Sequence, residues 1–92
     1  MKIRWTLEAA NDLEQIARHL LRDNPKAART VVRTIITDSI ANLKKFPKLG
    51  RPGVLENTRE LIIARLPYII VYRLKDDNAE ILRIYHAAQD WP

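Results

Sequence analysis

Leu66-Pro67-Tyr68-Ile69-Ile70-Val71-Tyr72-Arg73 is the stretch that decides the fold, and a similar run, Ile81-Leu82-Arg83-Ile84-Tyr85-His86, follows it. Both runs are rich in β-branched and aromatic residues, which favour extended strands. Between them, Asp76-Asp77-Asn78 consists of residues that favour tight turns. The sequence therefore predicts a hairpin whose strands cover residues 68–75 and 79–86.

A further strand is predicted just before this hairpin, over residues 58–66. Alternation along it places Arg59, Leu61, Ile63 and Arg65 on one face. Residues 47–57 contain two prolines and two glycines and are predicted to form a loop.

The first half of the chain carries a helical pattern. Residues 2–5 are predicted to form a short strand, and Thr6 can cap a helix that runs to about Arg22. Asn24 and Pro25 suit the cap and the first turn of a second helix, which Pro47 ends. The apolar stripes at three- and four-residue spacing are Ala10, Leu13, Ile16, Ala17, Leu20 and Leu21, then Ala28, Val31, Val32, Ile35, Ile36, Ile40, Leu43 and Phe46.

These elements predict a single α+β domain over residues 1–92. The order is β-α-α-β-β-β, with a helical hairpin packed on a small, mostly antiparallel sheet. Tyr68 and Tyr72 lie four residues apart on one strand, so both are predicted to pack in or beside the core.

Composition excludes several classes of site. The chain has no cysteine and only two histidines, which argues against disulfides, a metal site or a cofactor site. No apolar run approaches the length of a membrane span or of a signal peptide's apolar region, so a cytoplasmic protein is expected.

The formal net charge is +5, and the excess lies in the helical half. Residues 1–47 carry nine Lys or Arg and five Asp or Glu, whereas residues 48–92 carry seven and six. Two interpretations are open. The cations are solvated helix faces, or they border a groove for an acidic protein segment or a nucleic-acid backbone.

The order of motifs resembles the RelE/ParE superfamily of toxins from type II toxin–antitoxin systems. The matching residues are Ala9, Asp12 and Leu13, then Phe46-Pro47, Gly50-Arg51-Pro52, Arg59-Glu60-Leu61, Pro67-Tyr68, Tyr72 and His86. The resemblance implies a toxin that is neutralised by a cognate antitoxin and forms a hetero-oligomer with it.

Two branches of this superfamily imply different targets. ParE-like members are described as poisons of DNA gyrase, and RelE-like members as ribosome-dependent mRNA endonucleases. Where a RelE-like protein would carry basic residues, this chain has Leu61, Ile63 and Ile69, so the ParE-like branch is favoured. An inactive family member that only binds a partner is a third alternative.

The candidate site residues follow from these alternatives. A binding toxin would use Arg51, Arg59, Arg65, Arg73, Arg83 and Trp91 toward its partner or target. An endonuclease would use Arg59, Arg65, Arg83, Tyr85 and His86, with arginines stabilising the phosphate and Tyr or His moving protons. Salt bridges, for example to Glu80, are the alternative for the arginines, and a structural hydrogen bond is the alternative for His86.

Overall fold

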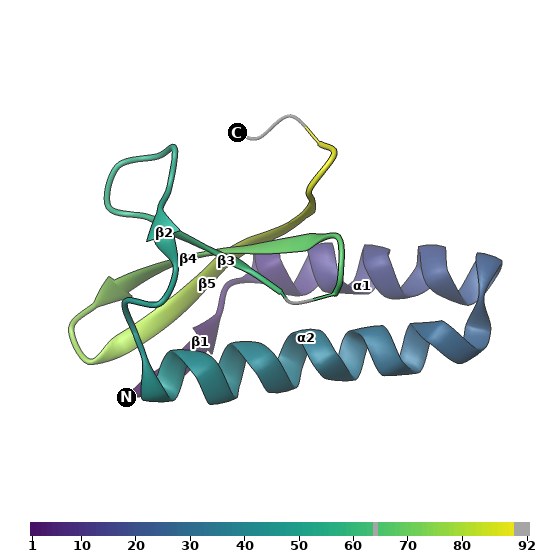
Figure 1. The fold of residues 1–92 in the computed structure, drawn as a ribbon, viewed down its shortest axis with the longest axis horizontal. Helices are drawn as coiled ribbons and strands as arrows, with labels where there is room; N and C mark the ends of the chain where they lie inside the picture. The colour runs from purple at the N-terminus through teal and green to yellow at the C-terminus, as the bar shows by residue number, and fades with distance from the viewer. Residues whose placement is uncertain (64, 90–92) are drawn as a thin grey trace.

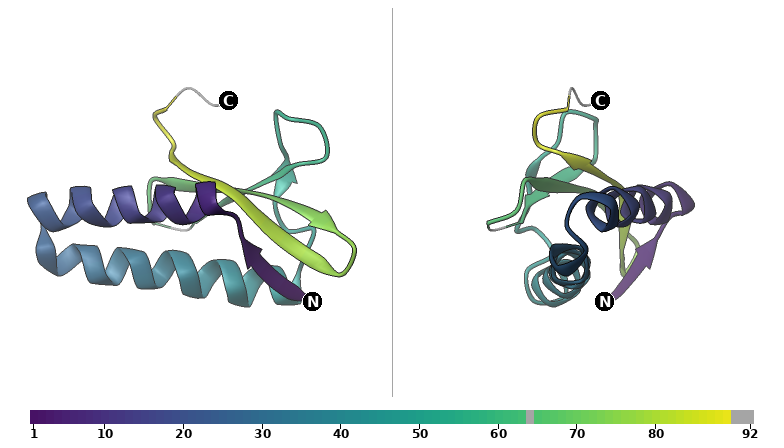
Figure 2. Two further views of the ribbon diagram at one scale, coloured as in Figure 1. Left: turned by 180° about the vertical axis from the view of Figure 1, so that it is seen from behind. Right: turned by 90° about the vertical axis from the view of Figure 1, so that its right-hand side faces the viewer.

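The computed structural model describes residues 1–63 and 65–89, and within them two helices lie alongside each other against a five-stranded sheet (Figures 1 and 2). The elements in chain order are β1 (Lys2–Trp5), α1 (Leu7–Asp23), α2 (Pro25–Lys45), β2 (Arg51–Pro52), β3 (Arg59–Ile62), β4 (Tyr68–Lys75) and β5 (Asn78–His86). This confirms the predicted α+β class and element order, to which β2 adds one very short strand.

Side-chain caps fix the ends of the two helices. The Thr6 hydroxyl oxygen accepts a hydrogen bond of 3.2 Å from the Ala9 N–H at the start of α1. Asn24 serves both helices, because its own N–H donates to Leu20 O at the end of α1 and its side chain accepts from the Ala27 N–H in α2. A one-residue joint forces the helices into an antiparallel hairpin, as predicted.

The sheet has the strand order β1-β5-β4-β3-β2. Strand β1 runs parallel to β5, and all other neighbours are antiparallel. A parallel pair cannot be joined by a tight turn, and the intervening helices and strands provide the long connection that it needs.

A register shift between Val71 and Tyr72 interrupts the pairing of β4 with β5. Val71 pairs with Arg83 and Tyr72 with Ile81, so Leu82 is an extra residue in β5. Because of this bulge, Ile81 and Ile84 both join the core although they lie three positions apart. Simple alternation would have placed them on opposite faces.

The core lies between the sheet and the helices. It comprises Leu61, Ile63, Tyr68, Ile70, Tyr72, Ala79, Ile81 and Ile84 from the sheet half, with Ala9, Ile35 and Leu43 from the helices. The burial of Tyr68 and Tyr72 confirms their predicted core placement. The Tyr72 hydroxyl accepts from the Gly50 N–H at 2.9 Å and donates to Pro47 O at 2.8 Å, which ties the loop after α2 to the core.

Two predictions for residues 47–66 were wrong in detail. Strand β3 ends at Ile62, because the chain turns there and Arg65 takes a φ of 67°, so Arg65 does not continue the alternation. The predicted loop over 47–57 contains β2, which pairs Arg51 with Glu60 and Pro52 with Arg59. Proline is tolerated in β2 because this strand is the sheet edge.

Candidate partner-binding surfaces

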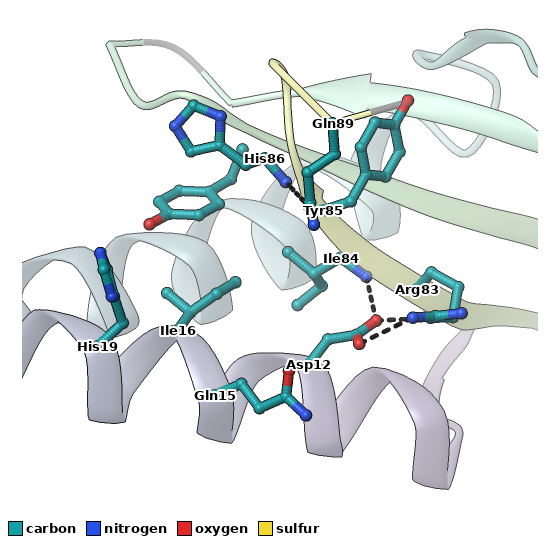
Figure 3. Close-up of a pocket in the computed structure, with 10 residues that line it drawn as sticks. Asp12, Gln15, Ile16, His19, Arg83, Ile84, Tyr85, His86 and Gln89 are labelled. Atoms are coloured by element: carbon teal, nitrogen blue, oxygen red, sulfur yellow. Dashed lines mark hydrogen bonds and ion pairs between the residues drawn. The ribbon is translucent and has the colours of Figure 1, made fainter. Parts of the chain in front are cut away.

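Asp12 of α1 binds the otherwise exposed edge of β5 (Figure 3). Its carboxylate accepts hydrogen bonds from Arg83 Nε at 2.7 Å, Arg83 Nη2 at 3.1 Å and the Ile84 N–H at 2.9 Å. The bond to Asp12 raises the pKa of Arg83. Arg83 is therefore held in a two-point ion pair, which is among the stronger polar interactions in proteins.

Glu60 is a buried carboxylate, with only 4% of its surface exposed. It accepts from Arg51 Nη2 at 3.0 Å, from Arg51 Nε at 3.3 Å and from the Val54 N–H at 3.3 Å. Burial, followed by the nearby Glu60 carboxylate, raises the pKa of Tyr85. Arg51, whose side chain stays 56% exposed, thus neutralises a buried charge beside Tyr85.

The other candidate arginines have separate environments. Arg73 Nε donates to Glu80 at 2.6 Å, across paired strands. Arg59 Nη1 donates to Gly50 O at 2.8 Å and to Lys48 O at 3.3 Å. Arg65 is exposed in the turn after β3.

These environments do not bring Arg59, Arg65, Arg73 and Arg83 together on one surface. Arg59 pairs with Tyr72, so it shares the face of the sheet that carries the core. Arg73 and Arg83 pair with Glu80 and Val71 and belong to the other face. The salt bridge to Glu80 considered for Arg59 or Arg65 is made by Arg73 instead.

His86 and Gln89 stabilise the turn after β5 (Figure 3). His86 Nδ1 accepts from the Ala88 N–H at 3.0 Å, and Gln89 Oε1 accepts from the His86 N–H at 2.7 Å. The His86 ring meets Tyr68 edge to face, with centroids 5.6 Å apart. These contacts give His86 the structural role that was one of its two alternatives.

A hollow of about 490 Å³ lies between α1 and the end of β5, and we call it the C-terminal hollow (Figure 3). Helix α1 contributes Asp12, Gln15, Ile16 and His19, and the sheet half contributes Tyr68, Arg83, Ile84, Tyr85, His86 and Gln89. His19 itself is exposed and lies 3.3 Å from Asp23.

An apolar groove, here called the helical groove, follows the seam between α1 and α2. Two hollows of about 510 and 400 Å³ share Ala17, Val32 and Ile36 as lining residues, so they form one continuous surface. Leu21 lines the first hollow and remains 55% exposed. Arg29 and Arg33 border this apolar surface. The excess positive charge of the helical half is thus partly concentrated beside a groove.

Three further expectations concern Trp91, a metal site and a membrane span. Trp91, a candidate for partner contact, lies outside them. Across residues 1–63 and 65–89, no three His, Asp or Glu side chains are grouped to hold a metal ion. None of the described helices is both long and apolar enough to span a membrane.

The chain matches a family model described as the ParE toxin of the type II toxin-antitoxin system parDE, over residues 3–91. The candidate toxin Y4kP of Sinorhizobium fredii is 46% identical over 91 residues, which cover 99% of this chain and 93% of that protein. Toxin RelE2 of Caulobacter vibrioides is 33% identical over 85 residues, covering 92% of this chain and 93% of that one.

Solved structures give the same result. A chain of the chromosomal ParDE system from P. aeruginosa superposes with a TM-score of 0.84 at 30% identity, covering 94% of this chain and 95% of that chain. The RelBE2 toxin–antitoxin complex of Mycobacterium tuberculosis shares the fold, with a TM-score of 0.66 at 23% identity over 92% of this chain and 95% of that one. Fold and sequence together define a toxin of the RelE/ParE superfamily. Within it, the chain belongs to the ParE toxin family of type II toxin–antitoxin systems.

Proposed function

We propose that this toxin acts by binding a target protein, with DNA gyrase as the target, and that a cognate antitoxin silences it by occupying the helical groove. The observation that carries the target assignment is the burial of Leu61, Ile63 and Ile69, which are 5%, 2% and 6% exposed. These are the positions where a RelE-like endonuclease would carry basic residues. Buried apolar side chains cannot stabilise a phosphate, so the described structure favours a binding toxin over an endonuclease.

The arginines support the same proposal. Arg51 and Arg83 neutralise Glu60 and Asp12, and Arg59 donates to the main chain of the loop after α2. Transition-state stabilisation needs donors that converge on the developing charge. Arg59 lies on the opposite face of the sheet from Arg51 and Arg83, so the three arginines do not converge in this way. The ribosome and mRNA are the alternative target.

The helical groove suits an amphipathic antitoxin segment with acidic residues. Leu21, Val32 and Ile36 offer apolar contact, while Arg29 and Arg33 offer cations that can pair with carboxylates at its border. Apolar anchors in a pocket with charges at the rim are the usual arrangement of a protein interface. The P. aeruginosa relative belongs to a ParDE system, and the M. tuberculosis neighbour was solved as a toxin–antitoxin complex.

The decisive experiment adds the purified toxin to two reactions, each with and without its antitoxin. One measures supercoiling of relaxed plasmid by gyrase, and the other measures mRNA cleavage by primer extension in a translation extract. Inhibition of supercoiling with intact mRNA, reversed by antitoxin, is the expected result. Cleavage of mRNA with normal supercoiling would instead assign an endonuclease, and inactivity in both reactions with retained antitoxin binding would assign a partner-binding module.

A further inference from the structure

The C-terminal hollow is lined by a buried tyrosine, Tyr68, whose hydroxyl has no hydrogen-bond partner among residues 1–63 and 65–89. Tyr68 lines the hollow and is only 7% exposed. Its hydroxyl makes no hydrogen bond within residues 1–63 and 65–89, and burial is the cause that raises its pKa. Buried polar groups are nearly always paired, because an unpaired one loses its bonds to water without compensation. An orphan hydroxyl at the wall of a hollow is therefore a candidate ligand contact.

The remaining walls restrict the charge of such a ligand. Asp12 and Arg83 are occupied by each other, so they contribute little net charge to the hollow. Gln15 and Gln89 carry neutral amides, and Ile16 and Ile84 add apolar surface. Among the described lining residues, Arg83 is paired with Asp12, His19 lies against Asp23, and His86 accepts a hydrogen bond at Nδ1. A phosphate or carboxylate is therefore poorly matched to this hollow, whereas an uncharged polar group would find donors and acceptors.

The main chain at the hollow restricts the ligand further. The N–H of Ile84 donates to Asp12, that of His86 to Gln89 Oε1, and that of Ala88 to His86 Nδ1. The Ala87 and Gln89 N–H groups donate to Pro67 O and His86 O. A peptide strand is recognised largely through main-chain donors, and these are already used. Recognition would therefore rest on side chains.

Aromatic side chains complete the site. The edge-to-face contact between Tyr68 and His86 leaves the His86 residue exposed at the hollow. Planar rings of ligands pack readily against such side chains. The volume of about 490 Å³ falls within the usual range for small-molecule pockets.

We propose that the C-terminal hollow binds an uncharged heteroaromatic ring with hydrogen-bonding edges, that is, a nucleobase. The Tyr68 hydroxyl bonds one edge atom of the base, Gln15 contributes a second polar contact, and His86 packs against the ring. The base comes either from a free nucleoside or from a single-stranded nucleic acid. This site is independent of the helical groove and of the gyrase proposal.

The test titrates isotope-labelled toxin with adenosine, guanosine, cytidine or uridine and follows amide signals by NMR. We expect saturable shifts for at least one nucleoside at residues 12–19 and 84–89. Tyr68→Phe removes only the hydroxyl, and should weaken binding about five- to tenfold through the loss of one neutral hydrogen bond. Gln15→Ala should also weaken it. Leu7→Ser, on the same helix but outside the hollow, is the matched control and should bind as the unaltered chain does.

Two further probes identify the source of the base. A short single-stranded oligonucleotide that binds more tightly than the nucleoside, and competes with it, assigns the base to a strand. Equal or weaker binding of the oligonucleotide and of nucleoside monophosphates assigns a free nucleoside. Absence of saturation with all four nucleosides and the oligonucleotide up to about 10 mM would overturn the proposal. If Tyr68→Phe binds nucleoside as tightly as the unaltered chain does, the proposal is overturned too. The same holds if Tyr68→Phe loses antitoxin binding while neither chain binds a nucleoside.

Discussion

Asp12 and Arg83 lie 71 residues apart in the chain and form a two-point ion pair of 2.7 and 3.1 Å that joins α1 to β5. The same carboxylate accepts from the Ile84 N–H, so it also satisfies a main-chain donor at the edge of β5. Strand β1 covers only the first part of that edge, from Asn78 to Ile81. Asp12 therefore continues the edge protection where β1 ends, and unpaired strand edges otherwise invite association with other chains.

Removing this carboxylate should destabilise the fold. Asp12→Ala leaves the Ile84 N–H and the Arg83 guanidinium without their main acceptor, and we expect a loss of about 1–3 kcal/mol, moderated by the solvent access of Arg83. Urea unfolding measures the change, and Asp77→Ala in the exposed turn is the matched control. A double-mutant cycle with Arg83→Ala should give a coupling well above zero, whereas additive effects would contradict the pairing.

The Arg73–Glu80 pair predicts a pH effect. The hydrogen bond from Arg73 is the main cause that lowers the pKa of Glu80 below its ordinary value of 4.5. A lowered folded-state pKa gives stability that is complete above the unfolded value and is lost as pH falls through the folded value. The urea midpoint should therefore fall as pH drops below about 4.5, and Glu80→Gln should flatten part of this dependence. If the urea midpoint of Glu80→Gln fell with pH below about 4.5 as steeply as that of the unaltered chain, the prediction would be contradicted.

Much of the fold follows from local signals. Thr6, Asn24 and Pro25 mark the helix boundaries, and the bounds of β1 and β4 match the predicted strands. Features that depend on register could not be predicted in this way. The bulge at Leu82 changes which β5 side chains face the core. No residue type in residues 78–86 predicts this bulge.

The candidate sites were harder to predict because they depend on contacts between distant segments. The pairing of Arg51 with Glu60 requires β2, which covers two residues in a segment that reads as loop. Asp12 was recognised only as part of a motif, and its contact with β5 appears only once α1 is packed against the sheet. The excess of cations in the first half left a groove as one of two open interpretations, and the position of the helical groove depends on the helix packing.

Replacement of Tyr72 by Phe should destabilise the fold, whereas the same replacement of Tyr68 should not. Tyr72→Phe removes the hydroxyl that bonds the Gly50 N–H and Pro47 O, and we expect a loss of about 1–3 kcal/mol in unfolding free energy. Tyr68→Phe removes a buried hydroxyl without a described partner, so stability should stay level or rise slightly. Thermal and urea unfolding of both variants checks the contrast. Equal losses would show that the Tyr68 hydroxyl is satisfied in solution.

A side chain at Gly50 should clash with the ring of Tyr72. A Cβ there would lie 2.7 Å from Tyr72 Cε1 and 2.8 Å from its hydroxyl oxygen, and the buried ring has no room to retreat. Gly50→Ala should destabilise the chain by about 1–3 kcal/mol, as overpacked core sites do. Combined with Tyr72→Phe, the loss should be less than additive, because both changes disturb one contact. If the two losses of unfolding free energy were fully additive in urea unfolding, the two changes would not disturb the same contact and the prediction would be wrong.

The helical groove gives the prediction closest to function. Leu21→Ser should weaken antitoxin binding about tenfold or more, because a buried interface leucine contributes on the order of 1.5–3 kcal/mol. Leu7→Ser is the matched control, since Leu7 also lies on α1, is 73% exposed and does not line the groove. Charge reversal at Arg29 or Arg33 should slow association and reduce its dependence on salt, since rim charges act mainly on the encounter. Calorimetry and surface-based kinetics with the purified antitoxin measure both effects. Equal losses for Leu21→Ser and Leu7→Ser, or none for either, would place the antitoxin elsewhere on the toxin.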